Sequence, residues 1–206
     1  MSITLILIII TALISWQAFS NRDMFYKLMH HPYQEMRDKQ YYRWFTSIFL
    51  HGSTMHLFIN MFVLYQFGTI VEQYFLSLFG ETMGRLNFLL LYLLSGIFAD
   101  IPTYFKHKNN QMFSSVGASG AVSGILFAYV IFDPWAMLLL FFIIPVPAII
   151  AAVLYLVYSS YASRKGGDNI DHDAHFYGAV FGFLFTIVLK PELFSLFVAN
   201  VTALPF

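Results

Sequence analysis

The sequence predicts an all-α membrane protein in which six transmembrane helices form one bundle. Hydrophobic residues make up 59% of the 206 residues and charged residues only 11%, with a mean hydropathy of +0.68. This is too apolar for a soluble domain of that size. The chain also contains six mostly apolar stretches of about 20 residues, the length that a transmembrane helix needs. We expect spans at roughly 2–20, 54–76, 86–105, 116–132, 135–158 and 174–190, within a single membrane domain over residues 1–206.

Composition and missing motifs exclude several functions. The formal net charge is zero, so the basic excess that nucleic-acid binding needs is absent. The chain has no cysteine, which rules out thiol chemistry. It has no H-E-x-x-H zinc motif, and no aspartate lies deep in a predicted span. We therefore expect no metal and no organic cofactor, and neither a metalloprotease nor an aspartyl protease.

The first span and its loop differ in character. Residues 2–20 lack both a basic leading region and a small-residue cleavage site, so they are interpreted as a retained span and not as a signal peptide. The loop of about 33 residues that follows is rich in tyrosine and tryptophan, which favour the membrane interface. We expect this loop to lie partly in the headgroup layer.

Later turns are marked by proline and glycine. Asp133-Pro134 predicts a tight turn from the fourth span into the fifth. The fifth span contains Pro145 and Pro147, which would interrupt a helix and permit it to bend, so we take this span as a candidate gate. Gly166-Gly167, in the next loop, is a candidate hinge for a cap over the site.

Polar side chains within the spans are costly in lipid and are therefore candidates for function. The second span opens with His56 and Asn60, four residues apart on one helix face, with His51 about one turn above. The fourth span opens with Ser119 between small residues, and the sixth carries His175 in its first turn. Even-numbered spans enter the membrane from the same face. The four intramembrane side chains are thus expected at similar depth near one surface.

This combination is typical of acyl-transfer chemistry. A serine becomes a good nucleophile when a neighbouring histidine accepts its proton, which assigns these roles to Ser119 and His175. The oxyanion that forms needs preorganised donors. Asn60, His56 and the free N–H groups at the start of the fourth span are suitable. A G-x-x-x-G face from Gly178 to Gly182 could pack against the fourth span and bring the two reacting groups together.

Each feature taken alone has a structural explanation. The small residues around Ser119 are also typical of helix packing, and His56 with Asn60 could form only an interhelical hydrogen-bond pair. A histidine at a helix mouth, such as His175, is often only an interfacial residue. The structural explanation must, however, account for nucleophile, base and oxyanion donors on one face at once.

Other polar residues are expected to be solvated or to compensate helix charge. The first group contains four loop histidines: His30, His31, His107 and His172. Asp171 and Asp173 could complete a triad with the base, but they lie at the water-facing edge of the sixth span. We favour charge compensation at the helix N-terminus for both.

The sequence resembles the rhomboid intramembrane serine proteases over nearly its whole length. The matching motifs are R-W-F-T-S-I-F-L-H-G-S-T-M-H-L-F-I-N-M (43–61), G-T-I-V-E (68–72), G-A-S-G (117–120) and A-H-F-Y-G-A-V-F-G (174–182). The resemblance implies that Ser119 is the nucleophile, that His175 is the general base and acid, and that His56 and Asn60 help to form the oxyanion hole. It implies structural roles for Arg43 and Glu72.

One position departs from the family pattern. Many bacterial members carry a tyrosine four residues after the nucleophile, stacked under the catalytic histidine, and here that position is Ser123. The orientation of His175 is therefore open. A smaller residue at this position would also let the fourth and sixth spans pack more closely.

Orientation in the membrane receives two conflicting predictions. The loops after the first, third and fifth spans carry most of the lysines and arginines, and the positive-inside rule would put them in the cytoplasm. The resemblance implies the reverse, with a cytoplasmic amino terminus and an active site that opens outward. We follow the resemblance, because the charge bias weakens where the first loop is long and partly embedded.

The expected function is cleavage of peptide bonds in or near transmembrane segments of other membrane proteins, with lateral access from the lipid bilayer. A catalytically inactive relative that binds membrane proteins is the main alternative, although such relatives usually lose the serine or the histidine. A small transporter is a further alternative, but no inverted repeat is visible. We expect a multi-pass protein of a bacterial inner membrane. The sequence identifies neither the substrate nor the oligomeric state.

Overall fold

The computed structural model describes residues 2–140, 143–167 and 170–203. Six helical segments form the bundle: α1 (Ile3–Ser20), the continuous helix made of α5 (Thr54–Val63), the π-helical turn η2 (Leu64–Gly68) and α6 (Thr69–Phe79), then α7 (Glu81–His107), α8 (Ser119–Phe132), α9 (Ala148–Lys165) and α10 (His172–Leu189). The first loop contains four short helices: α2 (Arg22–Leu28), α3 (Pro32–Asp38), α4 (Arg43–Thr46) and η1 (Ser47–Phe49). The remaining elements are a hairpin of β1 (Met137–Leu140) with β2 (Ile144–Pro147), and the C-terminal helix α11 (Glu192–Thr202).

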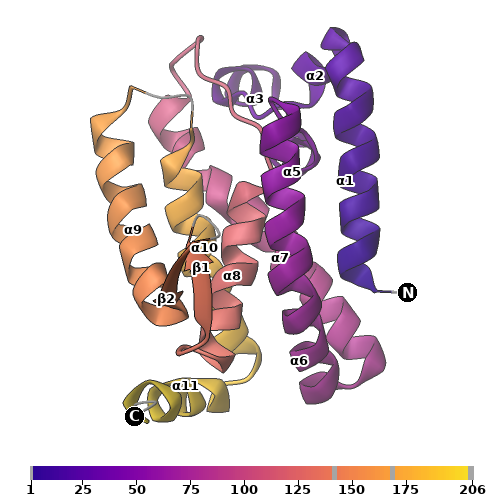
Figure 1. Cartoon of the computed structure of the whole chain (residues 1–206). Coiled ribbons are helices and arrows are strands. Elements are labelled where there is room, and N and C mark those ends of the chain that lie inside the picture. Colours follow the sequence, from indigo (N-terminus) through magenta and orange to yellow (C-terminus); the bar gives the residue numbers. More distant parts are fainter. Residues whose placement is uncertain (1, 141–142, 168–169, 204–206) are drawn as a thin grey trace.

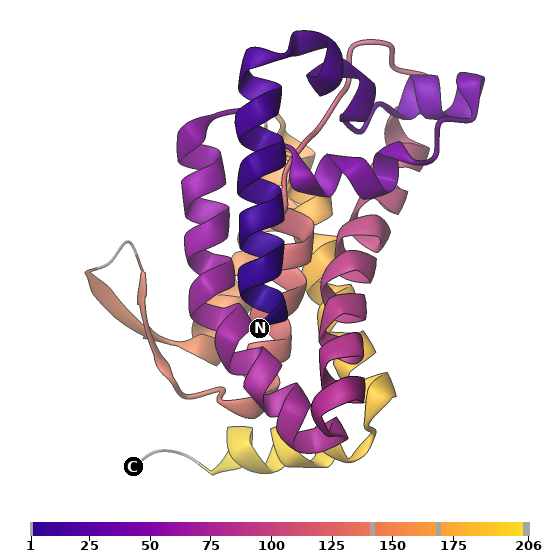
Figure 2. The same cartoon turned by 90° about the vertical axis from the view of Figure 1, so that its right-hand side faces the viewer.

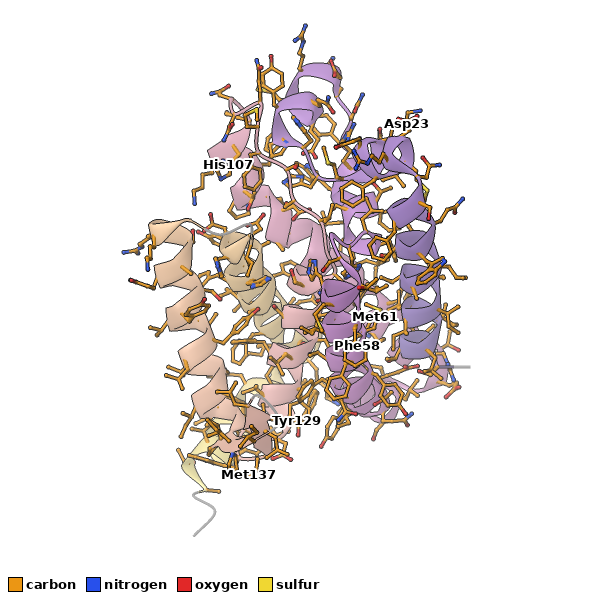
Figure 3. All side chains as sticks on the ribbon, turned by 45° about the horizontal axis from the view of Figure 1, so that its top comes forward. Asp23, Phe58, Met61, His107, Tyr129 and Met137 are labelled. Atoms are coloured by element: carbon orange, nitrogen blue, oxygen red, sulfur yellow. The ribbon has the colours of Figure 1, made fainter. Side chains whose placement is uncertain are left out.

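The bundle has two distinct ends (Figure 1). The first-loop helices α2 and α3 lie at one end, and α11 lies across the other (Figure 2). In Figure 3, Asp23 and His107 mark the first end and Met137 marks the second. The chain starts in α1 on the side of the second end, so α8 and α10 both begin toward the first-loop end. This arrangement agrees with the prediction that the even-numbered helices share one face.

Much of the outer surface of the bundle is apolar. Leu13 and Trp16 on α1, Phe58 on α5 and Val188 on α10 are each more than 60% exposed. Among the described residues, four helices are long and apolar enough to cross a membrane: Ile3–Ser20, Thr54–Phe79, Glu81–His107 and His172–Leu189. Apolar side chains on an outer surface are stable against lipid and costly in water. The chain is therefore a polytopic helical membrane protein, as predicted.

Helix α8 lies at the centre of the bundle and is shorter than its neighbours. Almost every residue from Gly120 to Ile131 is buried. Its 14 residues make a helix about 21 Å long, whereas the hydrocarbon core of a bilayer is about 30 Å thick. The loop that precedes α8 descends into the bundle to reach it (Figure 2). Ser119, the first residue of α8, is consequently recessed from the surface.

The predicted glycine contact between the fourth and sixth spans is confirmed. A Cβ atom added to Gly178 would lie 2.3 Å from the carbonyl oxygen of Gly120, and one added to Gly182 would lie 2.3 Å from Cα of Gly124. The backbones of α8 and α10 are therefore in direct contact. Only glycine permits this approach, as in other close helix pairs in membranes. His175 stands one turn from this contact on α10.

The first loop is held together by a buried arginine. Nη1 of Arg43 donates hydrogen bonds to the carbonyl oxygens of Tyr26 and Met29, at 2.7 and 2.9 Å. Its Nε and Nη2 atoms donate to the side chains of Gln40 and Gln34. This cation is therefore a structural element of the loop, as the resemblance implied. Because Arg43 is buried, its charge says little about which face of the membrane the first loop occupies.

The prediction of a continuous fifth span over 135–158 is wrong in its first half. Residues 137–140 and 144–147 form the antiparallel hairpin, in which Pro145 pairs with Leu139 and Pro147 pairs with Met137. Proline lacks an N–H group and disfavours helical geometry in the residue before it. The two alternating prolines consequently keep the chain extended, and α9 begins directly after Pro147. The prolines thus define the start of the helix and give it no internal bend.

Candidate functional site

The loop before α8 is fixed by contacts with the first loop of the chain. Ser115 and His30 exchange backbone hydrogen bonds of 3.0 and 3.1 Å, and the N–H of Gly117 donates to the carbonyl of Ser47 at 3.1 Å. Gly117 has a φ of +136°, which L side chains rarely adopt. This sharp turn delivers Ser119 to the first position of α8. The first N–H groups of the helix have no partner within it.

His51 ties the same turn to helix α1. Its Nε2 atom accepts the N–H of Ala118 at 3.3 Å, and its Nδ1 atom lies 3.0 Å from Oγ of Ser15. Because Nε2 is the acceptor, Nδ1 carries the proton and donates it to Ser15, which in turn donates to the carbonyl of Phe49. Burial, followed by the neighbouring His56, lowers the pKa of His51 to about 3. A neutral His51 therefore holds the serine turn in place. Our sequence interpretation gave it no role.

His56 and Asn60 lie on the side of α5 that faces the cavity next to Ser119. The His56 ring lies so close to Gly117 that a Cβ there would be 2.7 Å from Cε1 and 2.9 Å from Nε2. Asn60 donates one amide hydrogen to the backbone oxygen of His56 at 3.0 Å. The amide carries a second hydrogen that this bond does not use. His56 is thus placed against the turn that presents Ser119.

His175 lies in the first turn of α10, where Asp171 caps the helix. The side chain of Asp171 accepts the N–H of Ala174 at 3.0 Å and the hydroxyl of Thr103 at 3.0 Å. Asp173 accepts a hydrogen bond of 2.6 Å from the ammonium group of Lys106. Asp171 therefore compensates the helix N-terminus, as we favoured, and Asp173 forms an ion pair with α7.

The predicted site residues line one cavity. This cavity has a volume of about 700 Å³ and lies between α5, α8, α9 and α10. Its lining includes Ser119, His175, His56 and Asn60 together with apolar side chains of α5 and α8. Its volume falls in the range of ordinary ligand sites. The structure thus brings the four side chains together from three helices.

A second, small cavity adjoins Ser119 on the other side. It has a volume of about 20 Å³ and is lined by Ser47, Asp100 and Asp171 among others. Oγ of Ser47 donates to Asp100 at 3.2 Å. This volume suffices for one water molecule, and polar walls of this kind can bind one.

The ring beside His175 comes from α9. The Tyr155 ring stacks on the His175 ring with centroids 6.0 Å apart and planes inclined by 18°. The Tyr155 hydroxyl lies 2.6 Å from Oγ of Ser123, which donates to the carbonyl of Ser119 at 2.7 Å. An aromatic ring thus faces the histidine even though Ser123 occupies the position of the expected tyrosine. Our sequence analysis did not single out Tyr155, because its contact with His175 joins two different helices and no local pattern encodes it.

Three histidines that we predicted to be solvated are buried instead. His30 and His172 are 0% and 4% exposed, and His31 caps α3 at 9% exposed. Nδ1 of His30 lies 2.8 Å from the Glu35 carboxylate. Burial alone would lower the pKa of His30, but the nearby Asp100 and Glu35 carboxylates outweigh it and raise that pKa. A buried carboxylate partner is what allows the histidine to leave water.

The fold thus defines a polytopic membrane protein with a recessed cavity lined by both polar and apolar side chains, and comparison with known proteins identifies its family. The chain belongs to the rhomboid family, because the model of the Rhomboid domain matches residues 38–192.

Curated relatives agree with this assignment. The chain is 35% identical over 140 residues to presenilin-associated rhomboid-like protein A, mitochondrial, of Danio rerio, covering 66% of this chain and 34% of the relative. It is 27% identical over 173 residues to RHOMBOID-like protein 12, mitochondrial, of Arabidopsis thaliana, covering 81% and 51%. It is 30% identical over 144 residues to rhomboid protein 1, mitochondrial, of Saccharomyces cerevisiae, covering 68% and 39%. The matches span about a third to a half of the length of these relatives.

Proposed function

We propose that this chain is an intramembrane serine endopeptidase that hydrolyses peptide bonds in or near transmembrane segments of other membrane proteins. The observation that carries the proposal is the meeting of Ser119, His175, His56 and Asn60 on one recessed cavity. These are the residue types that acyl transfer requires. Membership of a family that includes serine proteases supports the same chemistry.

Acylation begins when His175 accepts the Ser119 proton. Oγ of Ser119 forms a bond to the scissile carbonyl carbon, and the electron pair of the C=O bond moves onto oxygen. As the tetrahedral intermediate collapses, the C–N bond breaks and the histidine gives its proton to the leaving amine. The product is an ester on Ser119 and a free amine.

The oxyanion of that intermediate needs donors that are in place before it forms. We assign this role to the remaining amide hydrogen of Asn60, the His56 ring and the first N–H groups of α8, which the Asn60–His56 bond and the closeness of His56 to Gly117 support. Gly117 permits the close approach of His56. The buried network through His51 keeps the turn from relaxing.

Deacylation repeats these steps with water. His175 takes a proton from a water molecule, whose oxygen attacks the ester carbon, and the proton then passes to Ser119 as the ester bond breaks. The small cavity beside Ser119 is a suitable place to hold this water within the membrane. Without such a cavity, few water molecules would reach a serine that lies within the membrane.

Substrates approach from the lipid. A helical substrate hides its carbonyl groups in hydrogen bonds, so cleavage favours segments with small or helix-breaking residues near the active-site face. The large cavity includes the apolar side chains of Met55, Ile59 and Leu126 in its lining. These suit side chains of a transmembrane substrate.

The orientation of the site in the membrane and the cellular compartment of the protein are separate questions. We propose that the site opens on the face opposite the amino terminus, where α8 and α10 begin. The expectation of a bacterial inner membrane gains no support from the relatives above, whose names all carry the word mitochondrial. We therefore assign a multi-pass membrane location and no particular compartment.

Purified protein in detergent, incubated with a fluorescently labelled single-span substrate, tests the proposal. We expect time-dependent cleavage by the wild type and none by Ser119→Ala, with both proteins melting at the same temperature. Equal cleavage by the two would overturn the assignment. Binding of the substrate by both without cleavage would favour the inactive-relative alternative.

A further inference from the structure

The contact between Tyr155 and His175 joins the base to a helix that carries none of the four proposed site residues. The rings are nearly parallel and offset, a favourable arrangement for two aromatic groups. One face of the His175 ring is therefore covered from α9. A ring in this place limits the rotation of the imidazole.

The direction of the hydrogen bond between Tyr155 and Ser123 follows from the number of hydrogens available. Ser123 has a single hydroxyl hydrogen, and Oγ of Ser123 lies 2.7 Å from the Ser119 carbonyl, a group that can only accept. The Tyr155 hydroxyl must then donate to Ser123 across their 2.6 Å contact. The chain of bonds runs from Tyr155 through Ser123 to the backbone of the nucleophile itself. Tyr155 thus contacts His175 directly and is linked to the backbone of Ser119 through Ser123.

Helix α9 itself is only narrowly attached to the bundle. Its buried positions are few and small, namely Ala148, Ala152, Ser159 and Ala162. Leu154, next to Tyr155, and Val157, two residues beyond it, are 55% and 63% exposed. Small buried side chains give up little apolar contact when a helix shifts. Tyr155 is the large side chain through which α9 reaches the site.

We propose that Tyr155 is a positioning residue for His175, and that docking of α9 on the bundle sets the orientation of the general base. This inference rests on the proposed function. With Tyr155 in place, His175 keeps the geometry that proton transfer from Ser119 needs. When α9 moves away from α8, the stack is lost and the base becomes free to turn.

The rate of fluorophosphonate labelling of Ser119 tests this, because it reports on the dyad without needing a peptide substrate. Loss of the stacked ring in Tyr155→Leu should slow labelling and lower kcat by about 10- to 100-fold, with little change in KM. Tyr155→Phe keeps the ring, so its labelling rate and kcat should fall much less. Tyr155→Met is measured in parallel, because methionine fills irregular space and guards against a folding defect.

The matched control is Leu154→Ala on the same helix. Leu154 is 55% exposed, and its truncation should leave labelling, kcat and the melting temperature unchanged. Ser123→Ala and Tyr155→Phe remove the same hydrogen bond. Their effects on labelling should therefore not add in the double variant.

A second readout does not depend on activity. In protein labelled with 13C-histidine, the ring signal of His175, assigned with His175→Gln, should shift in Tyr155→Leu as the ring current of the tyrosine is lost. It should move little in Leu154→Ala. An unchanged His175 signal in Tyr155→Leu would overturn the contact.

The outcomes separate this inference from the proposed function. If the wild type labels and folded Tyr155→Leu and Tyr155→Met label at the same rate, the positioning role is overturned while the protease assignment stands. If the wild type neither labels nor cleaves, the proposed function fails, and with it the role of Tyr155.

Discussion

Gly178→Ala should move the two halves of the proposed dyad apart without touching either. The added Cβ would lie 2.3 Å from the Gly120 oxygen, 2.8 Å from its carbonyl carbon and 2.9 Å from its Cα. All three are backbone atoms, so no flexible side chain can yield. Ordinary contact begins at 3.4 Å. The alanine must therefore displace α10 from α8 by about 1 Å.

Two effects of this displacement can be estimated. Overpacking of a tight contact costs about 1–3 kcal/mol of stability. A misplacement of about 1 Å between reacting groups can cost on the order of a hundredfold in rate. Because His175 precedes Gly178 by one turn on α10, we expect a loss of activity much larger than the loss of folded protein.

The assay measures fluorophosphonate labelling and thermal unfolding on the same preparation. Gly52→Ala is the control for stability, because its added Cβ would meet only Val116 at 3.9 Å, and its melting temperature should match the wild type. A Gly178→Ala protein with wild-type labelling and wild-type stability would refute the reasoning. It would mean that the helices are not in backbone contact.

Three further predictions concern other residues. Asn60→Ala should lower kcat by about 10- to 1,000-fold with little change in KM, whereas a lower melting temperature with normal kcat would reduce Asn60 to a helix-packing role. The pKa of His30 is raised above its ordinary 6.5, since the carboxylates of Asp100 and Glu35 outweigh the effect of burial. Protonated His30 therefore stabilises the fold below pH 6.5, and this contribution is lost as the pH rises through the folded pKa. The melting temperature should therefore fall as the pH increases through the folded pKa of His30, and His30→Asn should weaken this dependence of the melting temperature on pH. Glu72 accepts hydrogen bonds from the first residues of α1, so Glu72→Ala should cost about 1–3 kcal/mol in chemical denaturation, and an unchanged midpoint would contradict its structural role.

Hydropathy predicted much of the fold because lipid imposes a simple rule. A segment that crosses the bilayer must be apolar and must pair its own backbone groups, so apolar length translates into helices. The small-residue pattern at Gly178 and Gly182 predicted which helices touch, since close approach leaves few alternatives. The cost of polar groups in lipid also pointed to the four candidate site residues, which the structure brings to one cavity.

The sequence failed where contacts between distant segments decide the outcome. The region around Pro145 is apolar enough to be taken for a span, but the prolines favour an extended chain. His30 looked like a polar loop residue, and its burial depends on Glu35 and on the fold of the first loop. Tyr155 reaches His175 from another helix, a relation that no local pattern encodes.

The central claim is that Ser119 is a nucleophile activated by His175, and covalent labelling tests it most directly. Wild-type protein treated with a fluorophosphonate and digested for mass spectrometry should carry the adduct on Ser119 alone. Ser119→Ala and His175→Ala should carry none, while both keep the wild-type melting temperature. An adduct on another residue, or undiminished labelling of Ser119 in folded His175→Ala, would contradict the account.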